Sequence, residues 1–545
     1  MLRNVLEREA HKVETYNGAT VYDSSFDSLT DLFAKIGSMR YASDNESLSL
    51  FKKAFSEDPI TATRVLFYAR DCRGGYGERS VVLRIFYKFF CIEHPEWGSQ
   101  LVHWFAEMGR WKDLWDLVGM LIKDKGMEVM LDDTRADYPD IAGTIFDVIM
   151  VQFNDEICSV EAWNRGDLKE RPNISMLGKW MPSCHSQSKN VRNLFKWFSK
   201  SAQGLTYCMG EKYYRYYTKL LRTHIGIVEH NIVSKNYETI DYTKIPSRAL
   251  KRYKTLFEKY DAARFNEVMT KAANPEENPD VKLNVKQLYP YEILGEVRFG
   301  WNVVSCEAGD AETAMWYQMP NFFKRDVSIL PVLDTSGSMN GVKSSIATSL
   351  AIYTAQRNKH ETFKDMIMQF SDEPHMVSIK DKHSLSDIVK CFRCDNNSTD
   401  FEGVMLYLLN LAVQNNISPD EMPEYLLIIS DMQFNTLSRT YDMDLNPNSA
   451  KSSNIKIPMM EHIRKLYAET PYKIPTMIYW NVDDDAPRGS FPMSHLDGCI
   501  YISGKSPVIF DHLFDEKFPT SYELIKKITD SDRYNRITID FTKQD

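Results

Sequence analysis

Residues 334–339 read Asp-Thr-Ser-Gly-Ser-Met and follow an apolar run from Val327 to Leu333. Residues 342–356, which come next, have apolar positions at helical spacing. We therefore predict a strand that ends at Asp334 and a helix that begins a few residues later. In an open α/β sheet, ligands bind just outside the carboxyl ends of the strands. This stretch thus predicts both an α/β fold and the position of its site.

The side chains around this strand end carry oxygen donors. Asp334, Ser336 and Ser338 place one carboxylate and two hydroxyls at alternate positions. Thr399 adds a hydroxyl from a loop before a helical pattern, and Asp431 ends another apolar run. Mg²⁺ prefers oxygen ligands, few protein carboxylates and several retained waters. We predict that these five residues converge on one Mg²⁺ or Mn²⁺, although a lone Asp-x-Ser-x-Ser can also serve as a simple helix N-cap.

The residues that follow alternate between strand and helix patterns, as in a doubly wound sheet. Further strands are expected at 365–370, 376–379, 425–430, 476–482 and 499–503, and further helices at 401–414, 458–468 and 507–514. Pro331 lies inside the first strand, where proline loses a ladder hydrogen bond. We therefore expect a local bulge or an unpaired position there. These patterns predict a doubly wound, Rossmann-like domain over residues 326–545.

Residues 1–325 show a different pattern, with apolar residues at three- and four-residue spacing. The clearest helical stretches are 48–55, 62–69, 81–91, 101–108 and 114–122. Many short helices joined by short turns are typical of a stacked helical array, although no strict sequence period is present. The expected fold class is α plus α/β, with the boundary near residue 320.

A glycine-rich turn flanked by arginines occupies residues 70–79. A P-loop would need a preceding strand, and residues 63–69 look helical, so we exclude a P-loop. Two alternatives remain for this turn. It is either a corner between two helices tied by Arg–Asp and Arg–Glu pairs, or a contact for RNA phosphates.

The length and composition limit the class of protein. The chain has 545 residues, more than one hydrophobic core usually supports, so two or more domains are expected. Nine cysteines without a disulfide spacing favour reduced thiols and a cytoplasmic location. Neither a signal-peptide core nor an apolar run of membrane-spanning length is present, so we expect no membrane contact. The oligomeric state stays open.

The charge is distributed unevenly along the chain. Residues 171–260 contain 17 Lys and Arg against 5 Asp and Glu, a net charge of +12. Residues 326–545 contain 22 against 31, a net charge of −9. We call residues 171–260 the basic belt. Its cations are interleaved with tyrosines, a combination that suits single-stranded RNA because bases stack on aromatic rings while cations neutralise phosphates.

Two segments of the basic belt supply the candidate RNA-binding residues. These are Lys212, Arg215, Lys219, Arg222, Arg248, Lys251 and Arg252. The first four stand three or four residues apart, so a helix would place them on one face. Two other interpretations stay open. The belt could dock on the acidic C-terminal part, or its cations could simply be a solvated surface.

Several short sequence motifs follow one another in a defined order across nearly the whole chain. They lie at residues 70–79, 109–114, 179–183, 244–247, 290–293, 334–339, 430–434 and 479–481. In this the chain resembles the family catalogued as domain of unknown function 2828, found in plants, fungi and large viruses or phages. That family usually has an aliphatic residue where Pro331 stands.

The resemblance implies a helical module followed by a von Willebrand A domain. This architecture is similar to that of the Ro autoantigen, whose HEAT-like helical repeats, known as the TROVE module, bind RNA ends and small structured RNAs. The order Asp-x-Ser-x-Ser, Thr, Asp likewise resembles the metal-ion-dependent adhesion site of von Willebrand A domains, in which a partner's carboxylate completes the coordination.

Two functions are therefore expected as alternatives. The first is a non-catalytic, Ro-like protein that binds RNA through the helical module and a carboxylate-bearing ligand through Mg²⁺. The second is a metal-dependent protein-interaction scaffold without RNA binding, whose partner supplies an Asp or Glu. Metal-dependent phosphate-ester hydrolysis usually uses two metals held by several carboxylates. Here two carboxylates serve one ion, and the sequence contains no nucleophile with a base partner, so we do not expect an enzyme.

Overall fold

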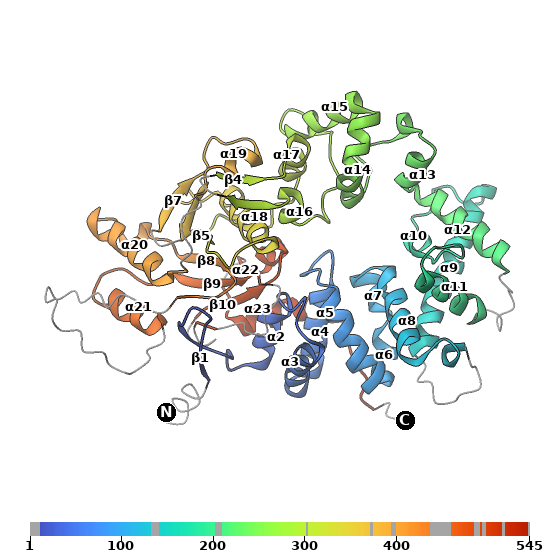
Figure 1. The fold of residues 1–545 in the computed structure, drawn as a ribbon, viewed down its shortest axis with the longest axis horizontal. Coiled ribbons are helices and arrows are strands. Elements are labelled where there is room, and N and C mark those ends of the chain that lie inside the picture. Colours follow the sequence, from blue (N-terminus) through green and yellow to red (C-terminus); the bar gives the residue numbers. More distant parts are fainter. Residues whose placement is uncertain are drawn as a thin grey trace.

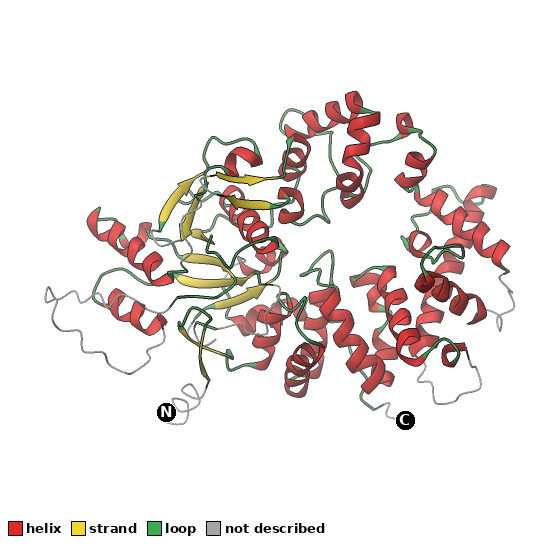
Figure 2. Cartoon of the chain, viewed as in Figure 1, coloured by secondary structure: helices red, strands yellow, loops and turns green. Residues whose placement is uncertain are grey.

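The computed structural model describes residues 11–131, 141–201, 210–300, 303–370, 374–393, 399–435, 459–483, 491–492, 498–514 and 518–542. Helices dominate the first part and a six-stranded sheet lies in the second (Figure 2). The expected coarse class, a helical part followed by an α/β part, is confirmed. No described helix is both long and apolar enough to cross a membrane.

The first part is built mostly from short helices. They are α2 (Ser28–Ile36), α3 (Asp44–Glu57), α4 (Pro59–Arg70), α5 (Ser80–Ile85), the π-helix η1 (Phe86–Glu93), α6 (Pro95–Leu101), α7 (Trp104–Met108), α8 (Trp111–Lys125), α9 (Ile141–Arg165), α10 (Leu177–Trp180), α11 (Lys189–Ser201), α12 (Glu211–Ile225), α13 (Val228–Val233), α14 (Ser247–Tyr260), α15 (Ala262–Ala273), α16 (Pro290–Leu294) and α17 (Asp310–Tyr317). Short 3-10 helices lie at Val129–Leu131 and Tyr237–Thr239.

Two antiparallel strand pairs also lie in the first part, which was expected to be mainly helical and for which no strands were predicted. The pair β1 (Lys12–Glu14) and β2 (Thr20–Tyr22) lies at its start, and the pair β3 (Val297–Gly300) and β4 (Val303–Cys306) near its end. These strands are three or four residues long. Such short strands carry too little alternation of polar and apolar residues to be recognised from sequence.

The second part alternates strands and helices. It contains β5 (Ile329–Asp334), α18 (Val342–Arg357), β6 (Met366–Phe370), β7 (His375–Ser378), α19 (Leu385–Val389), α20 (Phe401–Gln414), β8 (Tyr425–Ser430), α21 (Met459–Ala468), β9 (Thr476–Asn481), β10 (Ile500–Ser503), α22 (Phe510–Leu513) and α23 (Ser521–Thr529). Two 3-10 helices, Pro419–Glu421 and Pro507–Ile509, lie between these elements.

The sheet has the order β10-β9-β8-β5-β6-β7, with all pairs parallel except β6 with β7. Strand β5 is fully buried, as is β8. Alternate side chains of β5 enter two apolar clusters, since Ile329 and Leu333 belong to one and Leu330 and Val332 to the other. Helices α18, α22 and α23 contribute to the first cluster, and α20 and α21 to the second. Burial on both faces explains the continuous apolar runs of these strands.

Pro331 does not cause the bulge that its sequence position suggested. The register between β5 and β8 runs through Pro331, which pairs opposite Leu427. Pairing between β5 and β6 begins one residue later, at Val332. Pro331 therefore lies where β5 has a partner strand on one side only, which is the unpaired position that we gave as the alternative to a bulge.

The elements are arranged in a ring, so that the N-terminal helices lie beside the C-terminal ones (Figure 1). Helix α2 packs against β10, and α4 packs against α23. Ion pairs cross this junction from Lys526 to Asp58 at 3.0 Å and from Arg64 to Asp530 at 2.9 Å. Arg533 and Arg536 pair with Asp71 and Glu107 of the helical part. Most of these pairs join an acid of the first part to a cation of the second part. This is the opposite of what the net charges of residues 171–260 and 326–545 suggest. None of these pairs uses the basic belt.

Candidate metal centre and candidate nucleic-acid surface

The carboxyl ends of β5 and β8 lie side by side, because these strands are parallel neighbours. Asp334, the last residue of β5, is fully buried. Its Oδ1 accepts a hydrogen bond from the Ser336 amide at 2.9 Å, and its Oδ2 accepts one from the Ser430 hydroxyl at 2.5 Å. Asp431 follows β8 directly and is also buried. The two strand ends therefore place two carboxylates at one edge of the sheet.

The two serines of the Asp-x-Ser-x-Ser stretch lie between these carboxylates. The hydroxyls of Ser336 and Ser338 are 3.1 Å apart. The Ser336 hydroxyl lowers the pKa of Asp334, and the Ser338 hydroxyl lowers the pKa of Asp431, so each serine acts on one carboxylate. The serines link the two carboxylates into one polar network, as expected of groups that share a ligand.

Thr399 brings the third hydroxyl to the same place. Its backbone carbonyl accepts a hydrogen bond from the Asn435 amide at 3.0 Å, which joins the loop before α20 to the segment after β8. The Thr399 side chain has no solvent exposure, and its Oγ1 has no hydrogen-bond partner within the described part of the chain. A buried hydroxyl without a partner is unfavourable by about 1–3 kcal/mol. A cation ligated by Oγ1 would remove this penalty.

Ser336, Ser338, Thr399 and Asp431 line one pocket of about 380 Å³, with Asp334 buried next to them through its bond to Ser336. The structure thus brings together all five residues that the sequence predicted. Their donors are carboxylate and hydroxyl oxygens, which are the ligands that Mg²⁺ and Mn²⁺ prefer. The residues therefore fit such an ion.

Two charged residues of this pocket were missed by the sequence analysis. Asp483 lies two residues after β9, and its Oδ1 is 2.6 Å from Nζ of Lys343. Nζ of Lys343 is also 3.6 Å from Oδ2 of Asp431. Asp483 could have been found by the rule that identified Asp431, since both follow buried strands. Lys343, at the start of α18, gave no comparable signal.

Burial governs the protonation of the two carboxylates. It raises the pKa of Asp334, and the neighbouring charge of Asp431 raises it further, while hydrogen bonds from Ser430 and Ser336 oppose the shift. Burial also raises the pKa of Asp431, against the opposing effects of the Lys343 ammonium and the Ser338 hydroxyl. Without a bound cation, two negative charges in this pocket are therefore unfavourable.

The hairpin β1–β2 forms one wall of the pocket, which no local pattern indicated. Tyr16 and Asn17, in its turn, line the pocket beside Gln433. The Tyr16 amide donates to Oε1 of Gln433 at 3.0 Å, and Nδ2 of Asn17 donates to the Gln433 carbonyl at 2.6 Å. The hydroxyl of Thr15 donates to the Phe434 carbonyl at 2.6 Å. The start of the chain is thus bound beside a site built by residues more than 300 positions later.

The four cations of α12 lie together, as their spacing predicted. Lys212, Arg215, Lys219 and Arg222 line one pocket of about 920 Å³. The first three are exposed. Arg222 is different, because its guanidinium donates to the carbonyls of Gly178 and Met181 at 2.9 Å each. Arg222 therefore has a structural role that its spacing did not reveal.

The tyrosines of α12 divide between core and surface. Tyr214 is buried and donates its hydroxyl to the Pro182 carbonyl at 2.5 Å. Tyr213 and Tyr216 are 60% and 59% exposed, so both rings are open to stacking. Exposed aromatic rings beside exposed cations are a combination found in proteins that bind single-stranded nucleic acids.

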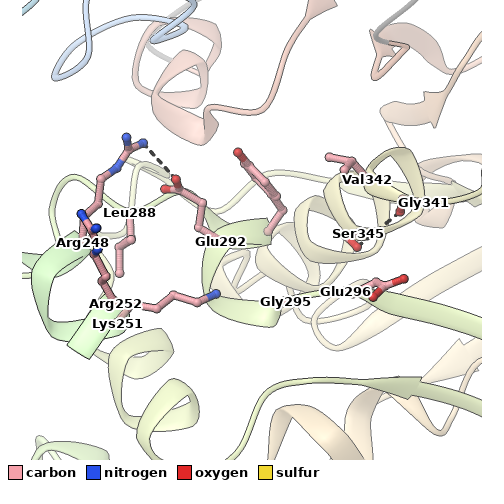
Figure 3. A pocket seen from close by; sticks show the side chains of 11 residues that line it. Arg248, Lys251, Arg252, Leu288, Glu292, Gly295, Glu296, Gly341, Val342 and Ser345 are labelled. Carbon is pink, nitrogen blue, oxygen red and sulfur yellow. Dashed lines mark hydrogen bonds and ion pairs between the residues drawn. The ribbon is translucent and has the colours of Figure 1, made fainter. Parts of the chain in front are cut away.

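The three candidate residues of α14 line a different pocket, of about 580 Å³, between α14, α16 and the start of α18 (Figure 3). Arg248 pairs with Glu292 at 2.9 Å across its mouth. Lys251 and Arg252 contribute the other cations, while Glu296 adds a second acid. This pocket is therefore less positive than the surface of α12, and the two sets of cations do not form one site.

The glycine-rich turn at 70–79 is a corner between α4 and α5. The buried side chain of Arg70 pairs with Asp113, and Glu78 pairs with Arg40 at 2.7 Å. Arg–Asp and Arg–Glu pairs therefore fix this turn, as expected for a corner between two helices.

The fold and the pocket define a two-part protein, with helices followed by a six-stranded α/β sheet that carries oxygen donors at its carboxyl edge. The family model described as Domain of unknown function (DUF2828) matches residues 15–140 and 144–318, more than half of the chain. The chain belongs to this family, which confirms the resemblance seen in the sequence. A second model, Domain of unknown function (DUF7788), matches residues 328–540.

A similar protein occurs in a large virus. An uncharacterized protein of Acanthamoeba polyphaga mimivirus is 23% identical over 549 residues, which cover 96% of this chain and 86% of that protein. The similarity therefore extends through both the helical part and the sheet.

Proposed function

We propose that this chain is a non-catalytic binding protein that holds RNA on its helical part and a carboxylate-bearing ligand at a divalent metal site. In this proposal the first part is a HEAT-like or TROVE-like module, as in Ro, and the second is a von Willebrand A domain. The observation that carries the RNA proposal is the surface of α12, where three exposed cations stand beside two exposed tyrosines. We further propose a cytoplasmic location, in keeping with the free thiols of the described cysteines.

The proposed RNA contact is mainly electrostatic. Lys212, Arg215 and Lys219 can neutralise phosphates, which position an RNA without reading its sequence. Tyr213 and Tyr216 offer ring faces for bases, a contribution of about 1–3 kcal/mol for each stacked base. Single-stranded segments suit this surface best, because only unpaired bases are free to stack.

The proposed metal centre uses the residues at the sheet edge. Asp334, Ser336, Ser338, Thr399 and Asp431 would hold Mg²⁺ or Mn²⁺, which supplies a positive charge that attracts an Asp or Glu of a partner protein. Thr399 offers its hydroxyl oxygen, which none of the described residues hydrogen-bonds. Asp483 is paired with Lys343 at 2.6 Å, so we assign the ion to two carboxylates. This count is the basis for proposing a binding role and no hydrolytic role.

Charge reversal on α12 tests the RNA proposal. The variant combines Lys212→Glu, Arg215→Glu and Lys219→Glu, and it spares Arg222 because that residue supports the fold. A matched control reverses three exposed lysines elsewhere, Lys123, Lys125 and Lys282. Filter binding at low salt should show that the α12 variant loses affinity for all single-stranded RNA sequences about equally, while the control keeps most of its affinity. Equal losses in both variants would mean that α12 is not the binding surface.

The second candidate function is a metal-dependent protein scaffold without RNA binding. The carboxylate–hydroxyl pocket favours it independently of the basic belt. If wild-type protein shows no affinity for single-stranded or structured RNA, this alternative replaces the first.

A further inference from the structure

A second cluster of metal-ligating side chains lies on the helical part, at the amino end of α12. Cys184 and His185 occupy the middle of a turn in which the Ser186 amide donates to the Ser183 carbonyl at 3.3 Å. Glu211, the first residue of α12, faces this turn, and its Oε1 is 3.1 Å from Nε2 of His185. One thiol, one imidazole nitrogen and one carboxylate oxygen all lie within 4.8 Å of one another.

The turn is held against α12 by hydrogen bonds that do not involve the three ligands. The buried Tyr214 donates its hydroxyl to the Pro182 carbonyl, two residues before Cys184. The guanidinium of Arg222 donates to the carbonyls of Gly178 and Met181. Because Tyr214, Arg222 and Glu211 belong to the same helix, the turn and Glu211 keep a fixed relation. The backbone positions of the three donor residues are therefore fixed relative to one another.

We propose that Cys184, His185 and Glu211 form a Zn²⁺ site, distinct from the all-oxygen centre at the sheet edge and independent of the RNA proposal. A thiolate, an imidazole and a carboxylate together suit Zn²⁺ and not Mg²⁺. Zn–ligand distances of about 2.0–2.3 Å would place tetrahedral donors roughly 3.3–3.8 Å apart. Donors that lie within 4.8 Å of one another reach this spacing by small side-chain rotations. Cys184 releases its proton to solvent when its sulfur binds the metal.

Three protein ligands leave a fourth position open on a tetrahedral ion. This is the arrangement of zinc sites that bind water or an external ligand, whereas structural zinc sites use four protein ligands. Cys184, His185 and Glu211 line the pocket of about 920 Å³ that also contains Lys212 and Arg215. The open position therefore faces a cationic pocket, and a water or a small anion would complete the coordination.

The alternative is that His185 and Glu211 form an ordinary exposed pair next to a cysteine and bind no metal. The side chains of His185 and Glu211 are 65% and 49% exposed, and such surface pairs contribute little to stability. This alternative predicts no metal affinity beyond that of scattered surface groups, and it predicts no sulfur ligand. Binding of Co²⁺ distinguishes a zinc site from a simple surface pair. Co²⁺ occupies zinc sites and gives a thiolate-to-metal charge-transfer absorption only when a cysteine ligates it.

The experiment uses the full-length protein with excess Mg²⁺, which occupies oxygen-only sites. Titration with Co²⁺ should reach one equivalent with a charge-transfer band, and Zn²⁺ should displace the Co²⁺ and remove the band. Cys184→Ser should abolish the band, whereas Cys158→Ser, at an exposed cysteine on α9, should preserve it. Glu211→Gln and His185→Gln, both conservative in size, should each weaken Zn²⁺ binding by roughly 10-fold or more.

The results distinguish a variant that fails to fold from a wrong assignment of the metal ligands. Far-UV circular dichroism and a cooperative thermal unfolding transition of each variant report whether the fold is intact. A wild-type protein without a charge-transfer band, or a folded Cys184→Ser variant that keeps the band, would overturn the proposal. If Cys184→Ser does not fold, unchanged Zn²⁺ affinity in folded Glu211→Gln and His185→Gln would overturn it equally.

Discussion

Replacing Asp334 with Asn should remove most of the stabilisation that Mg²⁺ gives to the folded protein. Asp334 is fully buried and lies near Asp431, so its charge is unfavourable without a cation. Asn keeps both hydrogen bonds, since its carbonyl oxygen accepts from the Ser336 amide and its amide group donates to the Ser430 hydroxyl. The metal-free variant should therefore be as stable as the metal-free wild type or more stable, by up to about 4 kcal/mol, because burial raises the pKa of Asp334 from 3.8 to about 7 and each pKa unit corresponds to about 1.4 kcal/mol.

With Mg²⁺ bound, the wild type should instead gain stability relative to Asp334→Asn. An ion that binds only the folded state stabilises it by roughly 2.7 kcal/mol at a concentration of 100 Kd. The wild type should gain this stability, and Asp334→Asn should gain almost none because it lacks one of two charged ligands. Urea unfolding of both proteins, with Mg²⁺ and with a chelator, measures all four free energies of unfolding. Asp387→Asn, which removes an exposed carboxylate on α19, is the matched control. Equal stabilisation of Asp334→Asn and the wild type by Mg²⁺ would refute the ligand assignment.

Other substitutions test single contacts. Thr399→Val removes a hydroxyl that has no hydrogen-bond partner among the described residues, so calorimetry should show Mg²⁺ affinity reduced by roughly 10-fold, while the metal-free protein keeps or gains stability. Lys343→Met removes the ammonium beside Asp483; Mg²⁺ affinity should rise because a competing cation is lost, and unchanged affinity would contradict this role. Arg70→Met removes the buried cation beside Asp113, while Arg79 still pairs with Asp113 at 2.7 Å; urea unfolding should therefore show a loss smaller than the roughly 3–5 kcal/mol of an unpaired buried charge, and a loss below about 1 kcal/mol would show that the Arg70 pair is dispensable.

Most strands and helices of the second part were predictable because their signals are local, whereas the short helices α19 and α23 were not expected. The apolar run before Asp431 matches β8 at Tyr425–Ser430, and the helical pattern after Thr399 matches α20 at Phe401–Gln414. Each is a buried element bounded by polar residues. Parallel strands place their carboxyl ends at one edge, so Asp334 and Asp431 were expected at the same edge; their direct proximity follows from the pairing of β5 with β8.

Long-range pairing explains what the sequence did not reveal. The hairpin β1–β2 is held at the candidate metal site by Gln433 and Phe434, more than 400 residues away. No periodicity within residues 11–22 indicates that partner. The closure of the chain between α4 and α23 likewise depends on contacts between its two ends.

Residue type and spacing also could not decide individual roles. Arg222 shares a face with Lys212, Arg215 and Lys219, yet only the structure shows its bonds to backbone carbonyls. The cluster of Cys184, His185 and Glu211 was equally hidden, since Glu211 lies 26 positions beyond His185 and reaches it only through the packing of α12.

The salt dependence of RNA binding tests the central claim most directly. Full-length protein should bind single-stranded RNA in filter binding at low salt, and the logarithm of the association constant should fall linearly with the logarithm of the salt concentration. Each neutralised phosphate of a single strand contributes a slope of about −0.7. Three phosphate contacts from Lys212, Arg215 and Lys219 thus predict a slope of roughly −2 or steeper, and reversal of these charges should remove most of it. No detectable binding at low salt, or an affinity unchanged by salt, would contradict the account.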